Sequence, residues 1–172
     1  MGRQLSAMKV AIIGYGNIGK RIGKLLKAFG AEVVAVDPML SGIIDGVSIV
    51  DIDMALKTSD IISIHSSGEA CILGDREFGI MKKGAYVLNA ARGSLIDEKA
   101  LIGAIENGII SSAWLDVFDQ EPYEGRLTQY PQVLLTPHIG SYTSECRKNM
   151  ETEAAQNLID AFGNNAIKRG GR

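Results

Sequence analysis

Cysteine is scarce in this chain of 172 residues, which contains only Cys71 and Cys146. Two cysteines are too few for a disulfide scaffold, and with only two histidines to help them they are too few for a zinc cage, so we expect no metal site. Lys and Arg total 18 against 20 Asp and Glu, which lacks the basic excess typical of nucleic-acid-binding proteins. No apolar run approaches the roughly 20 residues of a membrane span, and no secretory signal pattern is present. These features predict a cytoplasmic protein whose partners include neither nucleic acid nor membrane.

Aromatic residues are also few, at 6%, whereas glycine reaches 20 residues, and this composition favours an α/β fold. The first apolar run, Met8 to Ile13, is nearly continuous, as is typical of a strand buried on both faces of a parallel sheet. A stripe with helical spacing follows it and predicts the buried face of a helix: Ile18, Ile22, Leu25, Leu26 and Phe29. A second strand, Val33 to Val36, then completes a βαβ unit.

The same alternation of strands and helices continues to the end of the chain. Further strands are expected at residues 47–50, 61–64, 86–88, 112–117 and 133–135. Further helices are expected at residues 54–58, 75–81, 97–107 and 150–162. We therefore predict a doubly wound parallel sheet, the Rossmann fold, in a single domain that covers residues 1–172.

The segment between the first strand and the first helix, Gly14-Tyr15-Gly16-Asn17-Ile18-Gly19, matches the pattern G-x-G-x-x-G. In this pattern Gly14 permits the tight turn, Gly16 lets a pyrophosphate approach the backbone, and Gly19 lets the helix pack closely on the strand. Asp37 ends the second strand, where a carboxylate can bind the ribose hydroxyls of NAD and repel the extra phosphate of NADP. The fingerprint predicts an NAD site; the alternative is a plain glycine turn with Asp37 as a turn residue.

Three polar residues follow the later predicted strands, at the edge of the sheet where ligands of such folds bind. Arg92 follows the strand at 86–88, Glu121 follows the strand that contains Asp116, and His138 follows the strand at 133–135. A histidine exchanges protons near neutral pH, and a carboxylate partner orients its ring. A guanidinium group offers a planar fork that fits a carboxylate. Together they suit a carboxylate-bearing alcohol or ketone beside a nicotinamide.

Four ordered motifs carry a resemblance that extends from about Met8 to Phe162. They are the glycine loop with Asp37, the segment 89–93 (Asn-Ala-Ala-Arg-Gly), the segment 116–122, and the segment 136–140 (Thr-Pro-His-Ile-Gly). With these motifs the sequence resembles the D-isomer-specific 2-hydroxyacid dehydrogenase family, and within it the branch of enzymes like phosphoglycerate dehydrogenase.

The resemblance implies specific roles for these residues. Arg92 would bind the substrate carboxylate and polarise its carbonyl, His138 would be the acid and base, and Glu121 would be its partner. Asp116 would approach the nicotinamide end of the cofactor. The rest of the cofactor site, to which Arg92 and His138 also belong, would include Asn17, Ile18, Ala90, Ala91, Gly140 and Ser141. Family members commonly pair through this domain, so a homodimer is expected.

The resemblance also implies a substrate domain, which we interpret as absent from this chain. We therefore expect the chain to bind NAD but to turn over a 2-hydroxy or 2-oxo acid weakly or not at all, and an acid like 3-phosphoglycerate is one candidate substrate. An alternative is an NAD(H)-sensing module without catalysis, and another is the nicotinamide domain of an enzyme such as adenosylhomocysteine hydrolase. The ordered set of Arg92, Glu121 and His138 favours the dehydrogenase, whereas His65, which ends a predicted buried strand, is interpreted as structural.

Overall fold

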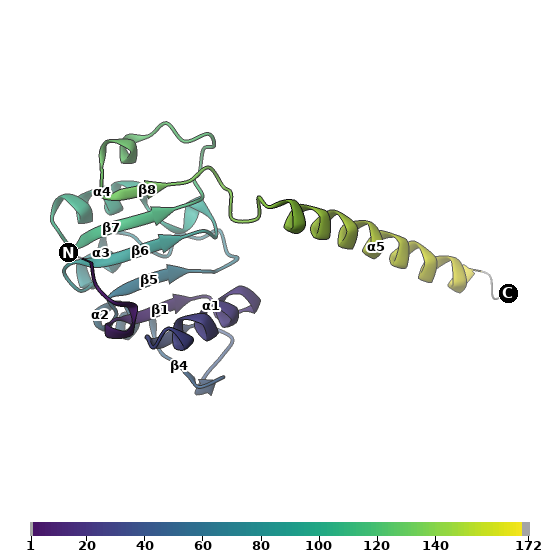
Figure 1. Cartoon of the computed structure of the whole chain (residues 1–172), viewed down its shortest axis with the longest axis horizontal. Helices are drawn as coiled ribbons and strands as arrows, with labels where there is room; N and C mark the ends of the chain where they lie inside the picture. Colours follow the sequence, from purple (N-terminus) through teal and green to yellow (C-terminus); the bar gives the residue numbers. More distant parts are fainter. Residues whose placement is uncertain (1, 170–172) are drawn as a thin grey trace. The chain divides into compact units, whose positions relative to one another are not determined.

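The computed structural model describes residues 2–169, with side chains placed as far as residue 162. Residues 9–135 contain one sheet of eight strands, in the order β3-β4-β2-β1-β5-β6-β7-β8 (Figure 1). The strands are β1 (Lys9–Ile13), β2 (Glu32–Val36), β3 (Ile43–Ile44), β4 (Val47–Ile49), β5 (Ile61–Ile64), β6 (Ala85–Asn89), β7 (Ile110–Leu115) and β8 (Val133–Leu135). The helices are α1 (Asn17–Ala28), α2 (Ile52–Thr58), α3 (Asp75–Ile80), α4 (Glu98–Glu106) and α5 (Ser144–Arg169). The predicted doubly wound sheet is confirmed.

The chain divides into two compact units between His138 and Ile139. The first unit contains the whole sheet and helices α1 to α4, whereas the second contains α5. Within the second unit the guanidinium carbon of Arg147 lies 5.7 Å from the centre of the Tyr142 ring. The predicted domain ran to residue 172, and its last three residues lie outside the described part of the chain. None of the described helices is long and apolar enough to cross a bilayer.

The edge strand β3 departs from the prediction of a wholly parallel sheet. It pairs antiparallel with β4, while the other strands of the described sheet pair in parallel. The two-residue turn that joins β3 to β4 consists of Asp45 and Gly46, with φ of 53° and 71°. Asp-Gly with positive φ at both positions is the turn that a tight hairpin prefers, because its twist matches that of the strands. The Asp-Gly pair between two apolar segments was therefore a hairpin signal that the sequence analysis missed.

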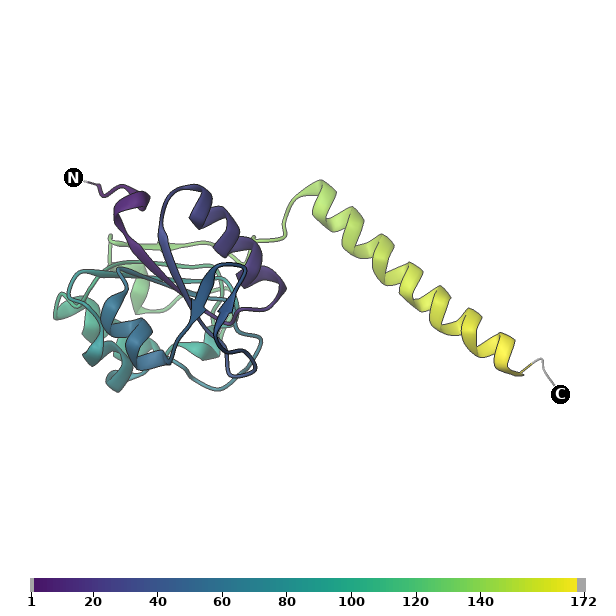
Figure 2. The ribbon, with the colours of Figure 1, turned by 90° about the horizontal axis from the view of Figure 1, so that it is seen from below.

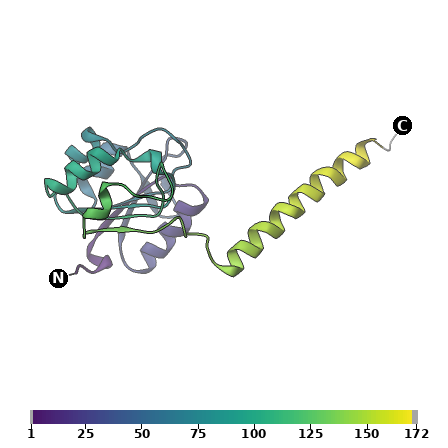
Figure 3. The same cartoon turned by 90° about the horizontal axis from the view of Figure 1, so that it is seen from above.

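The two faces of the sheet carry different helices. Helices α2, α3 and α4 pack on one face, and the larger core cluster, which includes Ile62, Val87 and Leu101, lies under them. Helix α1 packs on the opposite face, over β1 and β2, with Ile12 and Tyr15 in a smaller core cluster (Figures 2 and 3). The carboxyl ends of the parallel strands therefore meet along a single edge, where the loops that follow β1, β6, β7 and β8 begin.

Helix α1 packs on the sheet through only part of the predicted stripe, since Ile22 and Leu26 contact the smaller core cluster. Gly19 and Gly23 are its buried residues, and the apolar side chains of Ile18, Leu25 and Phe29 are more than half exposed. A Cβ atom on Gly19 would lie 2.2 Å from the carbonyl oxygen of Gly14, so the helix approaches the strand more closely than any larger residue allows. The prediction of the full apolar stripe as the buried face was wrong because glycines, which carry no hydrophobic signal, set the line of contact.

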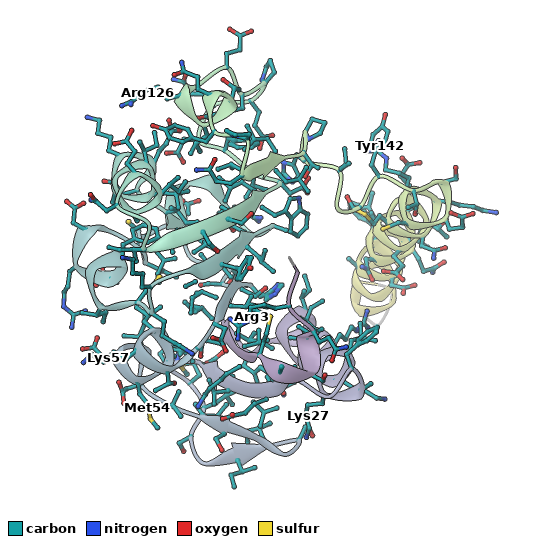
Figure 4. All side chains as sticks on the ribbon, turned by 60° about the vertical axis from the view of Figure 1, so that its left-hand side comes forward. Arg3, Lys27, Met54, Lys57, Arg126 and Tyr142 are labelled. Atoms are coloured by element: carbon teal, nitrogen blue, oxygen red, sulfur yellow. The ribbon has the colours of Figure 1, made fainter. Side chains whose placement is uncertain are left out.

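Asp60, just before β5, ties three separate segments together. Its carboxylate accepts hydrogen bonds from Lys82 Nζ at 2.7 Å, Arg3 Nη1 at 3.2 Å and the Lys9 N–H at 2.9 Å (Arg3 is labelled in Figure 4). Burial opposes ionisation of Asp60, but the Lys82 ammonium, the Lys9 N–H and the Arg3 guanidinium outweigh it and lower its pKa to about 2.

Asp60→Asn is therefore expected to lower the free energy of unfolding by about 2 kcal/mol at pH 7. Because the folded-state pKa lies below the unfolded value, this stability is present in full above about pH 5 and is lost as the pH falls toward 2. Urea unfolding at pH 7 and pH 3 measures both effects. Asp119→Asn, at an exposed aspartate, is the control and should change stability by less than about 0.5 kcal/mol. Equal effects of the two substitutions would contradict this role for Asp60.

Candidate active site

The glycine loop has the geometry that the fingerprint requires. Gly14 has φ of 91°, and a Cβ atom there would lie 2.6 Å from the Ser66 nitrogen, so only glycine fits this turn. Gly16, by contrast, faces open space, with no atom within 4 Å of a Cβ placed there. No side chain caps the first turn of α1, which begins at Asn17, so its backbone N–H groups face this space. The open side of Gly16 and the helix N-terminus together form a cradle for an anion.

Asp37 follows β2 and lies beside this loop. Its Oδ2 accepts a hydrogen bond from the Tyr15 N–H at 2.9 Å, and its Oδ1 accepts one from the Met39 N–H at 2.9 Å. The carboxylate therefore holds the glycine loop to the end of β2. Each carboxylate oxygen can accept more than one hydrogen bond, so Asp37 retains capacity for a ribose hydroxyl.

The loop after β6 is shaped by Asn89, whose side chain is buried. Its Nδ2 donates to the Arg92 carbonyl oxygen at 2.8 Å, and its Oδ1 accepts from the Ala91 N–H at 3.0 Å. These bonds fix the backbone from Ala90 to Arg92. The guanidinium of Arg92 is exposed, and its Nη1 donates to the Ala91 carbonyl oxygen at 2.7 Å.

Glu121 and His138 form a direct pair. Nδ1 of His138 lies 3.0 Å from Oε2 of Glu121, and Oε1 of Glu121 accepts from the Phe118 N–H at 3.1 Å. The hydrogen bond from His138, with that from the Phe118 N–H, lowers the pKa of Glu121 below its usual value. Because Glu121 is ionised at neutral pH, we assign the proton of this pair to Nδ1, which leaves Nε2 of His138 to exchange a proton with a bound molecule.

Asp116 is buried directly after β7. Thr136 donates a hydrogen bond from Oγ1 to Asp116 Oδ1 at 2.5 Å, and Trp114 Nε1 donates to the same Thr136 oxygen at 3.0 Å. This chain links the ends of β7 and β8. The prediction placed Asp116 within the strand at 112–117, but β7 ends at Leu115, so Asp116 begins the loop that leads to Glu121.

The predicted site residues of the first unit converge on one edge of the sheet. Arg92, Glu121 and His138 follow β6, β7 and β8, which are neighbours in the sheet. Gly93 brings two of these loops into contact, since a Cβ atom there would lie 2.2 Å from the Phe118 carbonyl carbon. The structure joins Glu121 to His138 directly, whereas the hydrogen bond of the Arg92 guanidinium goes to its own loop. Gly140 and Ser141 belong to the second unit.

Sequence reasoning missed the residues that hold this site in place. Asn89 lies within the segment 89–93, but no role was predicted for its side chain, nor for those of Thr136 and Trp114. An asparagine directly after a strand is a signal of a local turn, because its side chain bonds to nearby backbone groups. His65 is half-buried, and its Nε2 lies 2.9 Å from Ser63 Oγ. Burial lowers the pKa of His65, which suits a neutral structural residue.

Comparison with known proteins gives one consistent result. Residues 1–140 match the model of the D-isomer specific 2-hydroxyacid dehydrogenase NAD-binding domain. The chain is 38% identical to 4-methyl-2-oxopentanoate reductase A of Aspergillus oryzae, over 94% of its own length and 51% of the reductase. It is 33% identical to D-3-phosphoglycerate dehydrogenase 3, chloroplastic, of Arabidopsis thaliana, over 94% of its own length and 29% of that protein.

A solved structure shows the same relationship. The NAD-complexed form of a D-isomer specific 2-hydroxyacid dehydrogenase from Lactobacillus delbrueckii ssp. bulgaricus superposes with a TM-score of 0.85 at 30% identity, over 100% of this chain and 56% of that one. The chain thus spans about half, or less, of the length of these proteins. The chain belongs to the D-isomer specific 2-hydroxyacid dehydrogenase family and carries its NAD-binding domain.

Proposed function

We propose that this chain is the cofactor half of an oxidoreductase that transfers hydride between NAD and a D-2-hydroxy acid. The hydrogen-bonded pair of Glu121 and His138 carries the proposal. It lies at the edge of the sheet onto which the glycine loop opens, as a proton-transfer pair beside a nicotinamide must. A protein that only sensed NAD(H) would have no use for such a pair.

The residues around the glycine loop fit the dinucleotide. The Gly16 backbone and the N–H groups of Asn17 and Ile18 would hold its pyrophosphate, and Asp37 would bind the adenosine ribose. Asp37 would also repel the additional phosphate of NADP. Ala90, Ala91 and Asp116 would complete this part of the site toward the nicotinamide.

The chain's own residues would supply proton transfer and substrate binding. NAD, when bound, accepts or returns the hydride. In the oxidative direction, Nε2 of His138 would take the hydroxyl proton while Glu121 stabilises the charged ring. The exposed guanidinium of Arg92 would bind the substrate carboxylate through its two parallel donors and polarise the carbonyl that forms. The position of Arg92 on a rigid loop, fixed by Asn89, suits this anchoring role.

The substrate would be a small 2-hydroxy or 2-oxo acid. One relative is named for 4-methyl-2-oxopentanoate, which is a 2-oxo acid, and another for D-3-phosphoglycerate, which is a 2-hydroxy acid. An acid like 3-phosphoglycerate is therefore one candidate. We propose that the chain alone turns over such acids weakly or not at all, because the other wall of the cleft would come from a substrate domain.

We also propose that the chain forms a homodimer and acts in the cytoplasm. The exposed apolar side chains of Ile18, Leu25 and Phe29 on α1 support association, because burying them in an interface would be favourable. The two cysteines, both free thiols, suit a reducing compartment.

Titration of the 172-residue chain with NADH in a calorimeter tests the proposed function. We expect saturable binding with a micromolar to millimolar dissociation constant and at least tenfold weaker binding of NADPH, about 1.4 kcal/mol, because of Asp37. No heat with millimolar NADH would refute the cofactor assignment. A steady-state assay with 2-oxo acids and NADH tests the second part, and rapid turnover by the chain alone would refute the need for a substrate domain.

A further inference from the structure

A cavity lies between α1 and the β3–β4 hairpin, on the other side of α1 from its exposed apolar residues. Its volume is about 610 Å³, which is ample for a small ligand. It is lined by Tyr15, Lys20, Arg21, Lys24, Lys27 and Asp45. Four of these six side chains are cationic and one is a carboxylate, so the lining has a strong positive excess in a chain whose net charge is −2.

The Tyr15 side chain provides the buried part of this cavity. Tyr15 is only 1% exposed, and its ring passes beneath α1 at Gly23, where an added Cβ atom would lie 3.0 Å from the phenol oxygen. No group among the described residues forms a hydrogen bond with this hydroxyl. The hydroxyl belongs to a residue that lines the cavity, so it is able to donate to a ligand bound there.

The cations differ in how firmly they are held. Lys27 Nζ donates to the carbonyl oxygens of Asp45 and Gly46, both at 3.1 Å, and so ties α1 to the hairpin (labelled in Figure 4). Lys20, Arg21 and Lys24 are exposed, and none of them has an ion-pair partner among the described residues. The Asp45 carboxylate lines the cavity near Tyr15, and its charge, after burial, raises the pKa of the tyrosine. The hydroxyl therefore keeps its proton and acts as a donor.

We propose that this cavity is a binding site for a phosphate group, separate from the cofactor cradle. The Tyr15 hydroxyl would donate to one phosphate oxygen, and the side chains of Lys20 and Lys24, one turn apart on α1, would pair with the others. Asp45 would accept the proton of a monoprotonated phosphate and would disfavour a ligand with more negative charge.

The site is connected to the cofactor cradle through a single residue. The Tyr15 N–H belongs to the glycine loop and donates to Asp37, whereas the Tyr15 side chain lines the cavity between α1 and the hairpin. A phosphate bound to the hydroxyl would therefore restrain the glycine loop through the Tyr15 side chain. We expect phosphate to raise the affinity for NADH slightly, and by linkage NADH to raise the affinity for phosphate by the same factor.

Titration of the intact chain with inorganic phosphate at constant ionic strength, followed by calorimetry and by NMR shifts, tests the proposal. We expect saturation in the millimolar range, weakening of about tenfold in Tyr15→Phe, and weakening of a few-fold in Lys24→Gln. Lys99→Gln, an equal charge change on the exposed surface of α4, is the matched control and should have no effect. The phenylalanine variant retains the ring that packs on Gly23, so its fold should be preserved.

Repeating the titration with saturating NADH separates this site from the cofactor cradle. Binding that persists with NADH and keeps its sensitivity to Tyr15→Phe supports the proposal. Displacement of phosphate by NADH would place it in the cradle and overturn the proposal, as would equal weakening by Lys99→Gln or a lack of saturation at 50 mM (about fivefold above the expected range). Phosphate binding without NADH binding would refute the cofactor assignment alone.

Discussion

His138→Asn is expected to lower turnover about a thousandfold while NADH still binds. The variant retains a polar side chain but loses the ring nitrogen, Nε2, that would take the hydroxyl proton. Asparagine is the suitable replacement because His138 has φ of 53°, a left-handed conformation that asparagine tolerates better than most residues. Loss of rate in this variant would therefore report the lost proton transfer, and not a displaced loop.

The measurement needs an active protein, so the chain would be joined to the remaining part of one of its longer relatives and assayed at steady state. Glu124→Gln, at an exposed carboxylate in the same loop as Glu121, is the matched control and should retain nearly full activity. A His138→Asn rate within tenfold of the parent would contradict the assigned role. If the fused parent protein has no detectable activity, and the His138→Asn variant binds NADH as tightly as the parent, the result would instead favour an NAD(H)-sensing module.

The elements that position the site were largely predictable because each has a strong local signal. The run from Met8 to Ile13 predicted β1, and the structure places it at Lys9–Ile13. Gly30 and Gly108 both have positive φ just beyond a helix end, where glycine is a common signal of helix termination. Such signals depend on short-range sterics and hydrogen bonds, which follow from the types of residues that lie close together in the chain.

What the sequence did not predict depends on contacts between distant segments. The buried face of α1 is set by Gly19 and Gly23, whose importance lies in the closeness of another backbone and not in their own hydrophobicity. The link from Trp114 through Thr136 to Asp116 joins residues up to 22 positions apart, and no local pattern marks it. The pairing of Glu121 with His138 was suggested by a family resemblance, and the geometry now supports it at 3.0 Å.

The second large effect concerns the glycine loop, in which Gly16 and Gly19 are constrained in different ways. Gly19→Ala is expected to reduce NADH affinity at least a hundredfold, about 2.7 kcal/mol. Its Cβ would lie 2.2 Å from the Gly14 carbonyl oxygen and 3.2 Å from Ile12 Cγ2, so α1 must move away from β1 and take the cradle with it. Because this movement disturbs a packed core, we also expect a loss of about 1–3 kcal/mol in the free energy of unfolding.

Gly16→Ala separates cofactor binding from packing. Gly16 has φ of −78°, which alanine adopts without strain, and nothing lies within 4 Å of the added methyl group. The methyl group would instead occupy the space that a pyrophosphate needs, so NADH should bind at least tenfold more weakly, about 1.4 kcal/mol, with the unfolding free energy nearly unchanged. Gly103→Ala, inside α4 and also without neighbours, is the control for the added methyl group and should leave NADH affinity unchanged. If Gly16→Ala binds NADH as tightly as the parent, the dinucleotide must lie elsewhere, because the space beside Gly16 cannot hold both the added methyl group and a pyrophosphate.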